Sequence, residues 1–185
     1  FWGGDAESNF DQTQGLPSAL RGGLILGMSG VPYWGSDISG FKCFTSEPRD
    51  IEVYLRWAQV GAVSPIMQDQ NACVTLTGHA DKWTLWSDEE TTTVYGAMAR
   101  LHTRLQPYFM VLAREAHETG TPIMRHPFLL FPDQEDAWFT EDTFFLGPAL
   151  FAAPVVKRGV TTREVWLPPG RYVDFLDNTV FSGGA

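Results

Sequence analysis

The chain has 185 residues, of which 44% are hydrophobic, 14% aromatic and 19% charged, and its formal net charge is −9. The apolar fraction is enough for a buried core and excludes a disordered chain. The negative charge and the lack of a basic cluster argue against a nucleic-acid partner. We also expect no membrane partner, because no apolar stretch in the sequence reaches the length of a membrane span.

The first two thirds of the chain alternate short extended segments with helices. Pro17 and the leucines at every fourth position from Leu16 predict a helix that ends near Gly30. Residues 31–34 are expected to form a short buried strand that leads into a loop over 35–41. A second helix is expected from Ser46, as its N-cap, to about residue 61. Residues 62–67 form another apolar segment before a polar run.

The longest helical pattern runs from about residue 93 to residue 119, with apolar residues every three or four positions. Pro107 is expected to kink or split this helix, and Gly120 closes it. After Gly120 the period changes, and residues 122–131, 143–156 and 163–175 predict strands. The predicted fold is therefore α/β, with a parallel α/β part over residues 1–120 and a small antiparallel β domain over residues 121–185.

Two cysteines, Cys43 and Cys73, do not make a disulfide framework. We expect two buried thiols, and a single bridge between neighbouring loops is the alternative. No spacing of cysteine and histidine indicates a zinc site. We expect no metal and no organic cofactor.

The N-terminal run Phe1-Trp2-Gly3-Gly4-Asp5 places a carboxyl group beside an aromatic ring and two residues without side-chain bulk. The glycines let another molecule approach the backbone, and the indole offers a flat apolar face. A carboxyl group in such surroundings can keep its proton near neutral pH and act as a general acid. The alternative is an ordinary Gly-Gly turn closed by an aspartate.

Three polar loops, over residues 2–5, 34–41 and 68–71, each follow an apolar segment. In parallel α/β folds, functional residues lie just past the carboxyl ends of the strands, so we expect these loops on one rim. Each holds an aspartate: Asp5, Asp37 and Asp69. Any one of them alone could be a cap or turn residue. Together, with aromatic neighbours in an acidic, tryptophan-rich chain, they favour a cleft for a polyol such as a sugar.

Further short motifs follow in order along nearly the whole chain. They include Gly35-Ser36-Asp37-Ile38-Ser39-Gly40-Phe41, Arg56-Trp57-Ala58-Gln59-Val60-Gly61-Ala62, Arg104-Leu105-Gln106-Pro107-Tyr108, Gly120-Thr121-Pro122-Ile123-Met124-Arg125 and Leu167-Pro168-Pro169-Gly170. With the N-terminal run, this series resembles family 31 of the glycoside hydrolases, the α-glucosidases, α-xylosidases and their relatives.

The resemblance implies the second half of a (β/α)8 TIM barrel, from the end of strand six, followed by the start of a C-terminal β-sandwich. Asp5 matches the acid/base aspartate of the family, and Trp2 matches a tryptophan that walls the sugar subsite. Asp37 matches an aspartate that helps organise that subsite, with a loop-capping role as the alternative, and Phe41 matches an aromatic residue nearby. Trp34, at the start of the same loop, is also predicted to bind substrate.

The sequence departs from the family pattern in two ways. The nucleophilic aspartate of the family lies on an earlier strand and has no counterpart here. Gln70 stands where α-glucosidases carry a histidine that bonds sugar hydroxyls, and Gln68 replaces an arginine. Gln70 is still predicted to bind substrate, since an amide donates and accepts hydrogen bonds. An α-xyloside, an α-galactoside or a modified sugar is then as fitting as an α-glucoside.

The predicted function is that of a retaining α-glycosidase that removes a terminal α-linked sugar by double displacement. A transglycosylase of the same family and a non-catalytic carbohydrate-binding module are the alternatives. We expect this piece alone to be inactive. The sequence indicates neither a compartment nor an oligomeric state.

Overall fold

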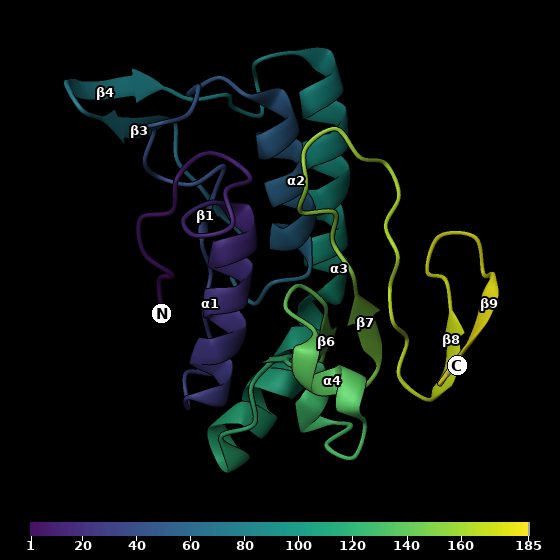
Figure 1. Cartoon of the computed structure of the whole chain (residues 1–185). Coiled ribbons are helices and arrows are strands. Elements are labelled where there is room, and N and C mark those ends of the chain that lie inside the picture. The colour runs from purple at the N-terminus through teal and green to yellow at the C-terminus, as the bar shows by residue number, and fades with distance from the viewer. Residues whose placement is uncertain (185) are drawn as a thin grey trace.

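The computed structural model describes residues 1–184. Figure 1 shows the three longer helices running alongside one another, with short strands at both ends and on one side. The helices are α1 (Leu16–Met28), α2 (Ile51–Ala62), α3 (Glu89–Thr119) and α4 (Glu135–Phe139), with a 3-10 turn at Pro127–Leu129. The strands are β1 (Asp37–Ile38), β2 (Gln68–Asp69), β3 (Ala72–Thr75), β4 (Gly78–Asp81), β5 (Met124–Arg125), β6 (Phe144–Leu146), β7 (Leu150–Ala152), β8 (Gly170–Val173) and β9 (Val180–Gly183).

The first two helices form where apolar periodicity predicts them. In α1 a proline occupies the first turn, where its missing N–H costs nothing, and the leucines spaced four apart are buried. In α2 the N-cap is Asp50, whose carboxylate accepts a hydrogen bond from the Val53 amide at 3.1 Å. The prediction of Ser46 as this cap is wrong. Its hydroxyl donates instead to the buried carboxylate of Glu7, at 2.9 Å.

Helix α3 is longer than predicted and continuous. It begins at Glu89, because Asp88 caps the amide of Thr91 at 2.7 Å, and it ends at Gly120 in the left-handed conformation. Pro107 lies inside it without splitting it. One lost backbone hydrogen bond is therefore tolerated within this long helix.

The parallel part of the fold is built from three segments in chain order. Trp2 pairs with Gly35, and Glu7 pairs with Lys42, which in turn pairs with Val74, all in parallel. β1 and β2 add a parallel ladder in which Asp37 faces Gln68 and Ile38 faces Asp69. The strand expected at residues 31–34 is displaced, because pairing begins only at Gly35. The β3–β4 hairpin, which follows β2, was not predicted.

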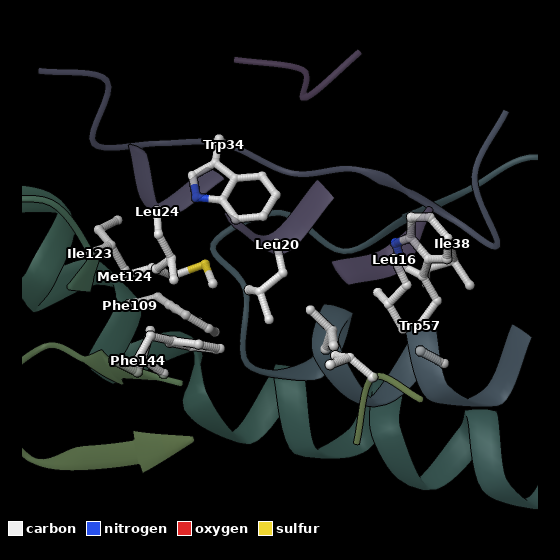
Figure 2. Close-up of a cluster of buried hydrophobic side chains, with 14 of the residues drawn as sticks. Leu16, Leu20, Leu24, Trp34, Ile38, Trp57, Phe109, Ile123, Met124 and Phe144 are labelled. Carbon is white, nitrogen blue, oxygen red and sulfur yellow. The ribbon is translucent and has the colours of Figure 1, made fainter. Parts of the chain in front are cut away.

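The hydrophobic core lies between this parallel edge and the helices. Figure 2 shows Trp34 and Ile38 in the same cluster as the buried leucines of α1 and Trp57 of α2. Phe109 and Leu112 from α3 join the cluster, as do Met124 of β5 and Phe144 of β6. One apolar core therefore continues from the parallel part into the β segments after residue 120.

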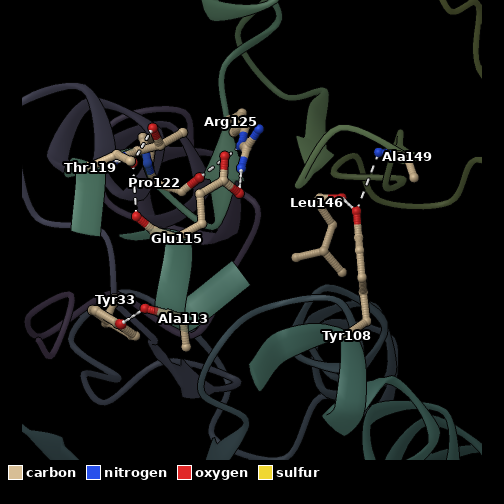
Figure 3. A network of polar contacts seen from close by, with 10 residues as sticks. Tyr33, Tyr108, Ala113, Glu115, Thr119, Pro122, Arg125, Leu146 and Ala149 are labelled. Carbon is tan, nitrogen blue, oxygen red and sulfur yellow. Dashed lines mark hydrogen bonds and ion pairs between the residues drawn. The ribbon is translucent and has the colours of Figure 1, made fainter. Parts of the chain in front are cut away.

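Polar contacts tie α3 to those later segments, as Figure 3 shows. The guanidinium of Arg125, in β5, donates to the Glu115 carboxylate at 2.5 Å and to the Pro122 carbonyl at 3.0 Å. The Tyr108 hydroxyl donates to the Leu146 carbonyl at 2.9 Å. Because Arg125 is buried, its pairing with Glu115 also offsets the cost of placing a cation inside the protein.

The strands after residue 120 pair in antiparallel fashion, in the order β5-β6-β7 and β8-β9. They are shorter than the sequence predicts. The segment 122–131 is only partly extended, 143–156 folds into the β6–β7 pair, and 163–169 runs without ladder pairing before β8. In Figure 1 the β8–β9 hairpin stands apart at the end of a long extended connection.

Candidate active site

The parallel pairings bring polar side chains from three segments together. Trp2, Asp37, Gln68 and Gln70 form one hydrogen-bonded group, named the rim cluster below. These residues lie where the pairing of the three segments begins. Two of the predicted substrate-binding residues, Trp2 and Gln70, therefore both contact a third, Asp37.

Asp37 is the centre of the rim cluster. Its side chain is only 1% exposed, and its carboxylate accepts three hydrogen bonds. The Trp2 indole N–H reaches Oδ2 at 3.1 Å, and the amides of Gln68 and Gln70 reach Oδ1 at 2.6 and 3.2 Å. A carboxylate with its acceptors used in this way holds its neighbours in place. It orients Trp2 and the two glutamines, which lie nearer the surface.

The two aromatic residues of the rim lie edge to face. The rings of Trp2 and Phe41 have centroids 6.3 Å apart at an interplanar angle of 86°. Trp2 is 47% exposed, although its indole N–H is bound to Asp37. An exposed, fixed indole is suited to stacking against the apolar face of a sugar ring.

Asp5 lies close by along the backbone and is exposed. The segment that carries it is anchored by a hydrogen bond from the Gly3 amide to the Gly35 carbonyl, at 2.8 Å. This bond and the Trp2–Gly35 pairing fix the start of the segment beside the rim cluster. The structure thus leaves the carboxyl group of Asp5 accessible to another molecule.

Trp34 does not lie with the others, and the prediction that it contacts substrate is wrong. Its side chain is 2% exposed and belongs to the core, on the side of the chain that faces α1. A Cβ at Gly23 would lie 1.8 Å from the Trp34 ring, so the glycine makes room for the indole. Trp34 is a packing residue.

A buried polar group that the sequence analysis missed lies behind the rim cluster. Lys82 is fully buried, and its ammonium donates to the carbonyls of Ile38 and Gly40. Nearby, the Tyr54 hydroxyl donates to the Asp69 carboxylate. Burial raises the pKa of both Asp69 and Tyr54 and lowers the pKa of Lys82 to about 8. No local pattern marks Lys82, because its partners lie more than forty residues earlier.

Cys43 and Cys73 form a disulfide, so the expectation of two free thiols is wrong. Their Cα atoms are 5.8 Å apart, because Lys42 and Val74 pair as neighbouring backbone segments. This proximity arises from the parallel pairing of Lys42 with Val74 and could not be read from a separation of 30 residues along the chain. The bridge fixes that hairpin to the loop that follows Phe41.

Two further features bear on the kinds of site that the described residues offer. Over residues 1–184 no group of histidine, cysteine, aspartate or glutamate side chains is arranged to hold a metal ion. None of the helices described there has both the length and the apolar character needed to cross a membrane.

Comparison with known proteins decides the family. The model of the glycosyl hydrolases family 31 TIM-barrel domain matches residues 1–112, and that of the family 31 C-terminal domain matches residues 120–185. The chain belongs to glycoside hydrolase family 31. Its architecture is accordingly a family 31 TIM-barrel domain joined to the C-terminal domain of that family.

Several curated relatives match nearly the whole chain. A sulfoquinovosidase of Agrobacterium fabrum is 30% identical over 99% of the chain, and an α-glucosidase 2 of Bacillus thermoamyloliquefaciens is 33% identical over 99%. An isomaltosyltransferase of Sporosarcina globispora is 32% identical over 100%. The chain spans 27%, 22% and 17% of the length of these three relatives, respectively.

Solved structures agree with this assignment. A family 31 sulfoquinovosidase from E. rectale, in complex with an aza-sugar inhibitor, superposes with a TM-score of 0.85 at 26% identity. The superposition covers 99% of this chain and 27% of the sulfoquinovosidase chain. A family 31 α-xylosidase from a soil metagenome, complexed with xylose, superposes with a TM-score of 0.81 at 32% identity. This superposition covers 100% of this chain and 29% of the α-xylosidase chain.

Proposed function

We propose that this chain is part of a retaining α-glycosidase, in which Asp5 is the acid/base catalyst for the removal of a terminal α-linked sugar. Residues 1–120 would be the second half of the (β/α)8 barrel, and residues 121–185 the start of the C-terminal β domain. One observation carries the proposal. In a family 31 chain, the accessible carboxyl group of Asp5 lies on the segment whose Trp2 is bound to the buried Asp37.

The geometry gives each residue a distinct part. Trp2 and Phe41 offer aromatic surface against which a sugar ring can stack. Gln68 and Gln70 use their amide N–H groups on Asp37, so their amide oxygens remain to accept hydrogen bonds from hydroxyl groups. Asp37 is buried, and it orients this set of side chains. The site is suited to an uncharged polyol.

The proposed mechanism is a double displacement. A carboxylate elsewhere in the intact protein attacks the anomeric carbon, and the glycosidic C–O bond breaks as Asp5 gives its proton to the leaving oxygen. In the second step the Asp5 carboxylate takes a proton from water, whose oxygen attacks the anomeric carbon and releases the first carboxylate. Inversion at each step gives overall retention.

Replacement of Asp5 by alanine in the intact enzyme tests the proposal. A natural disaccharide needs protonation of its leaving oxygen, and a 4-nitrophenyl glycoside needs little. We expect kcat/KM to fall by about 10²- to 10⁴-fold for the disaccharide and far less for the aryl glycoside. Turnover of the disaccharide within about tenfold of the wild type would exclude Asp5 as the general acid. Sugar binding without turnover in the wild type would favour the non-catalytic alternative.

Transfer to a sugar instead of water is the second candidate. It is favoured by the similarity to the isomaltosyltransferase and differs only in the acceptor of the second step. Incubation of the wild type with a high concentration of acceptor sugar separates the two. A hydrolase releases free monosaccharide as the main product, and a transglycosylase forms longer oligosaccharides.

A further inference from the structure

Lys82 is an unusual residue for its surroundings, because lysine is almost never fully buried without partners. Its side chain is 0% exposed, and its Nζ lies 2.7 Å from the Ile38 carbonyl and 2.6 Å from the Gly40 carbonyl. Its backbone amide donates to the Asn71 carbonyl at 2.9 Å. One residue therefore joins the end of the β3–β4 hairpin to the loop that carries Asp37.

The loop that Lys82 binds has a backbone that needs support. Ser39 and Gly40 both adopt the left-handed conformation, with φ of 64° and 67°. This conformation is unfavourable for a non-glycine residue such as Ser39. It turns the carbonyls of Ile38 and Gly40 toward the Lys82 ammonium, which can donate to both at once. A lysine at this place thus stabilises a loop conformation that the loop's own sequence disfavours.

The negative charges near Lys82 come from β1 and β2, the two strands of the parallel ladder. Asp37 of β1 and Asp69 of β2 are the two anionic groups that stabilise its ammonium. The Asp69 carboxylate accepts hydrogen bonds in turn from the Tyr54 hydroxyl of α2 and from the backbone N–H of Gln70, the latter at 2.8 Å. Tyr95 of α3 stacks on Tyr54 with ring centroids 5.6 Å apart.

We propose that Lys82 is a positioning residue for the sugar site, holding the Ile38–Gly40 turn so that Asp37 and Phe41 present the rim cluster to substrate. This role rests on the proposed function above. Lys82 itself does not touch the sugar. It acts through Asp37 on one side of the turn and Phe41 on the other, so its loss should disturb sugar binding more than the chemistry.

The proposal has a consequence for pH dependence. Burial lowers the pKa of Lys82 to about 8 from its ordinary 10.5, against the attraction of Asp69 and Asp37. Above pH 8 the neutral amine is a weaker donor, so KM should rise. The unfolded chain keeps this proton up to about pH 10.5. Between pH 8 and pH 10.5 the unfolded chain binds more protons than the folded chain, so the contribution of Lys82 to stability rises with pH. A rise in KM over this range therefore cannot be caused by unfolding at Lys82.

The test uses the intact enzyme with the 4-nitrophenyl α-glucoside, α-xyloside or α-galactoside that the wild type hydrolyses fastest. Lys82→Met keeps the length of the side chain and removes the donors, while Lys157→Met removes an exposed lysine as the matched control. We expect Lys82→Met to raise KM by about tenfold or more with a smaller change in kcat, and the control to stay within about twofold. A KM within about twofold of the wild type in folded Lys82→Met would overturn the proposal.

The wild type supplies a second test if Lys82→Met does not fold. Its KM should rise above about pH 8 while its melting temperature stays constant. In Asp69→Asn the rise should begin at lower pH, because the negative charge of Asp69, which raises the pKa of Lys82, is removed. A KM that stays constant up to about pH 9.5, or an unshifted rise in Asp69→Asn, would contradict the proposal. A wild type that hydrolyses neither these glycosides nor the 4-nitrophenyl α-glycoside of a modified sugar would instead count against the proposed function.

Discussion

Two neighbouring parts of the rim place an aspartate in opposite surroundings. Around Asp37 the chain is buried, each carboxylate oxygen has a donor, and the backbone is held by Lys82 and a disulfide. Around Asp5 the chain is exposed and anchored mainly through the backbone at Gly3. Environment sets the part that a carboxyl group can play. A bound carboxylate orients its neighbours, whereas an accessible one can exchange a proton with substrate.

The largest expected effect concerns the core beneath the rim. Trp34→Ala should lower the free energy of unfolding of the intact protein by about 3–5 kcal/mol, because it empties a large buried site against α1. Denaturant unfolding measures this change. The fraction that stays folded should keep the wild-type KM, since Trp34 does not face the rim. A stable variant with a raised KM would indicate that Trp34 contributes to substrate binding.

The disulfide supports the buried part of the rim and should matter nearly as much. Cys43→Ser combined with Cys73→Ser should lower the free energy of unfolding by about 2–4 kcal/mol, because the unfolded chain gains freedom. The same shift should follow when the wild type is reduced before thermal unfolding. Equal melting temperatures with and without reductant would show that the bridge adds no stability.

Asp37→Asn tests the buried carboxylate directly. The new side chain can still accept hydrogen bonds from Gln68 and Gln70. Its NH₂ group would face the indole N–H of Trp2, and two donors cannot form a hydrogen bond. We expect a loss of about 1–3 kcal/mol in stability and a raised KM. Asp133→Asn removes the same charge from an exposed residue and is the matched control. Unchanged stability and KM in Asp37→Asn would mean that the bonds to Asp37 do not organise the rim.

The smallest expected effect lies at the link between the two regions. Trp2→Phe keeps an aromatic ring and removes the hydrogen bond to Asp37. Stability should change by about 1 kcal/mol or less, because Trp2 is half exposed. KM for an aryl glycoside should rise several-fold, because the ring is no longer fixed. A large loss of stability with an unchanged KM would make Trp2 a packing residue instead.

The fold was predictable where the information is local. Leucines four apart and a first-turn proline mark α1, and Gly120 marks the end of α3. The error at Ser46 arose because two nearby residues could serve as caps, and the sequence does not show that Ser46 bonds to the distant Glu7. The β3–β4 hairpin was missed because its strands are short, and the disulfide was missed because it depends on the distant pairing of Lys42 with Val74.

The sequence predicts which loops form the site, but not which side chain of each loop faces it or what that side chain does. Parallel order along the chain brings Trp2, Asp37 and Gln70 together, as their positions after apolar segments suggest. Which side of a short extended segment a residue faces depends on its packing, and so Trp34 was assigned to the wrong side. Lys82 carries no signal at all, because its two carbonyl partners belong to another part of the chain.

Azide rescue of Asp5→Ala in the intact enzyme tests most directly whether Asp5 handles the proton. Azide needs no general base, so it should restore turnover of an aryl α-glycoside in this variant. It should attack the covalent intermediate on the face that water uses and give an α-glycosyl azide. Rescue with that product supports Asp5 as the acid/base residue. A variant that hydrolyses natural substrates like the wild type, or that azide does not accelerate, would contradict the assignment.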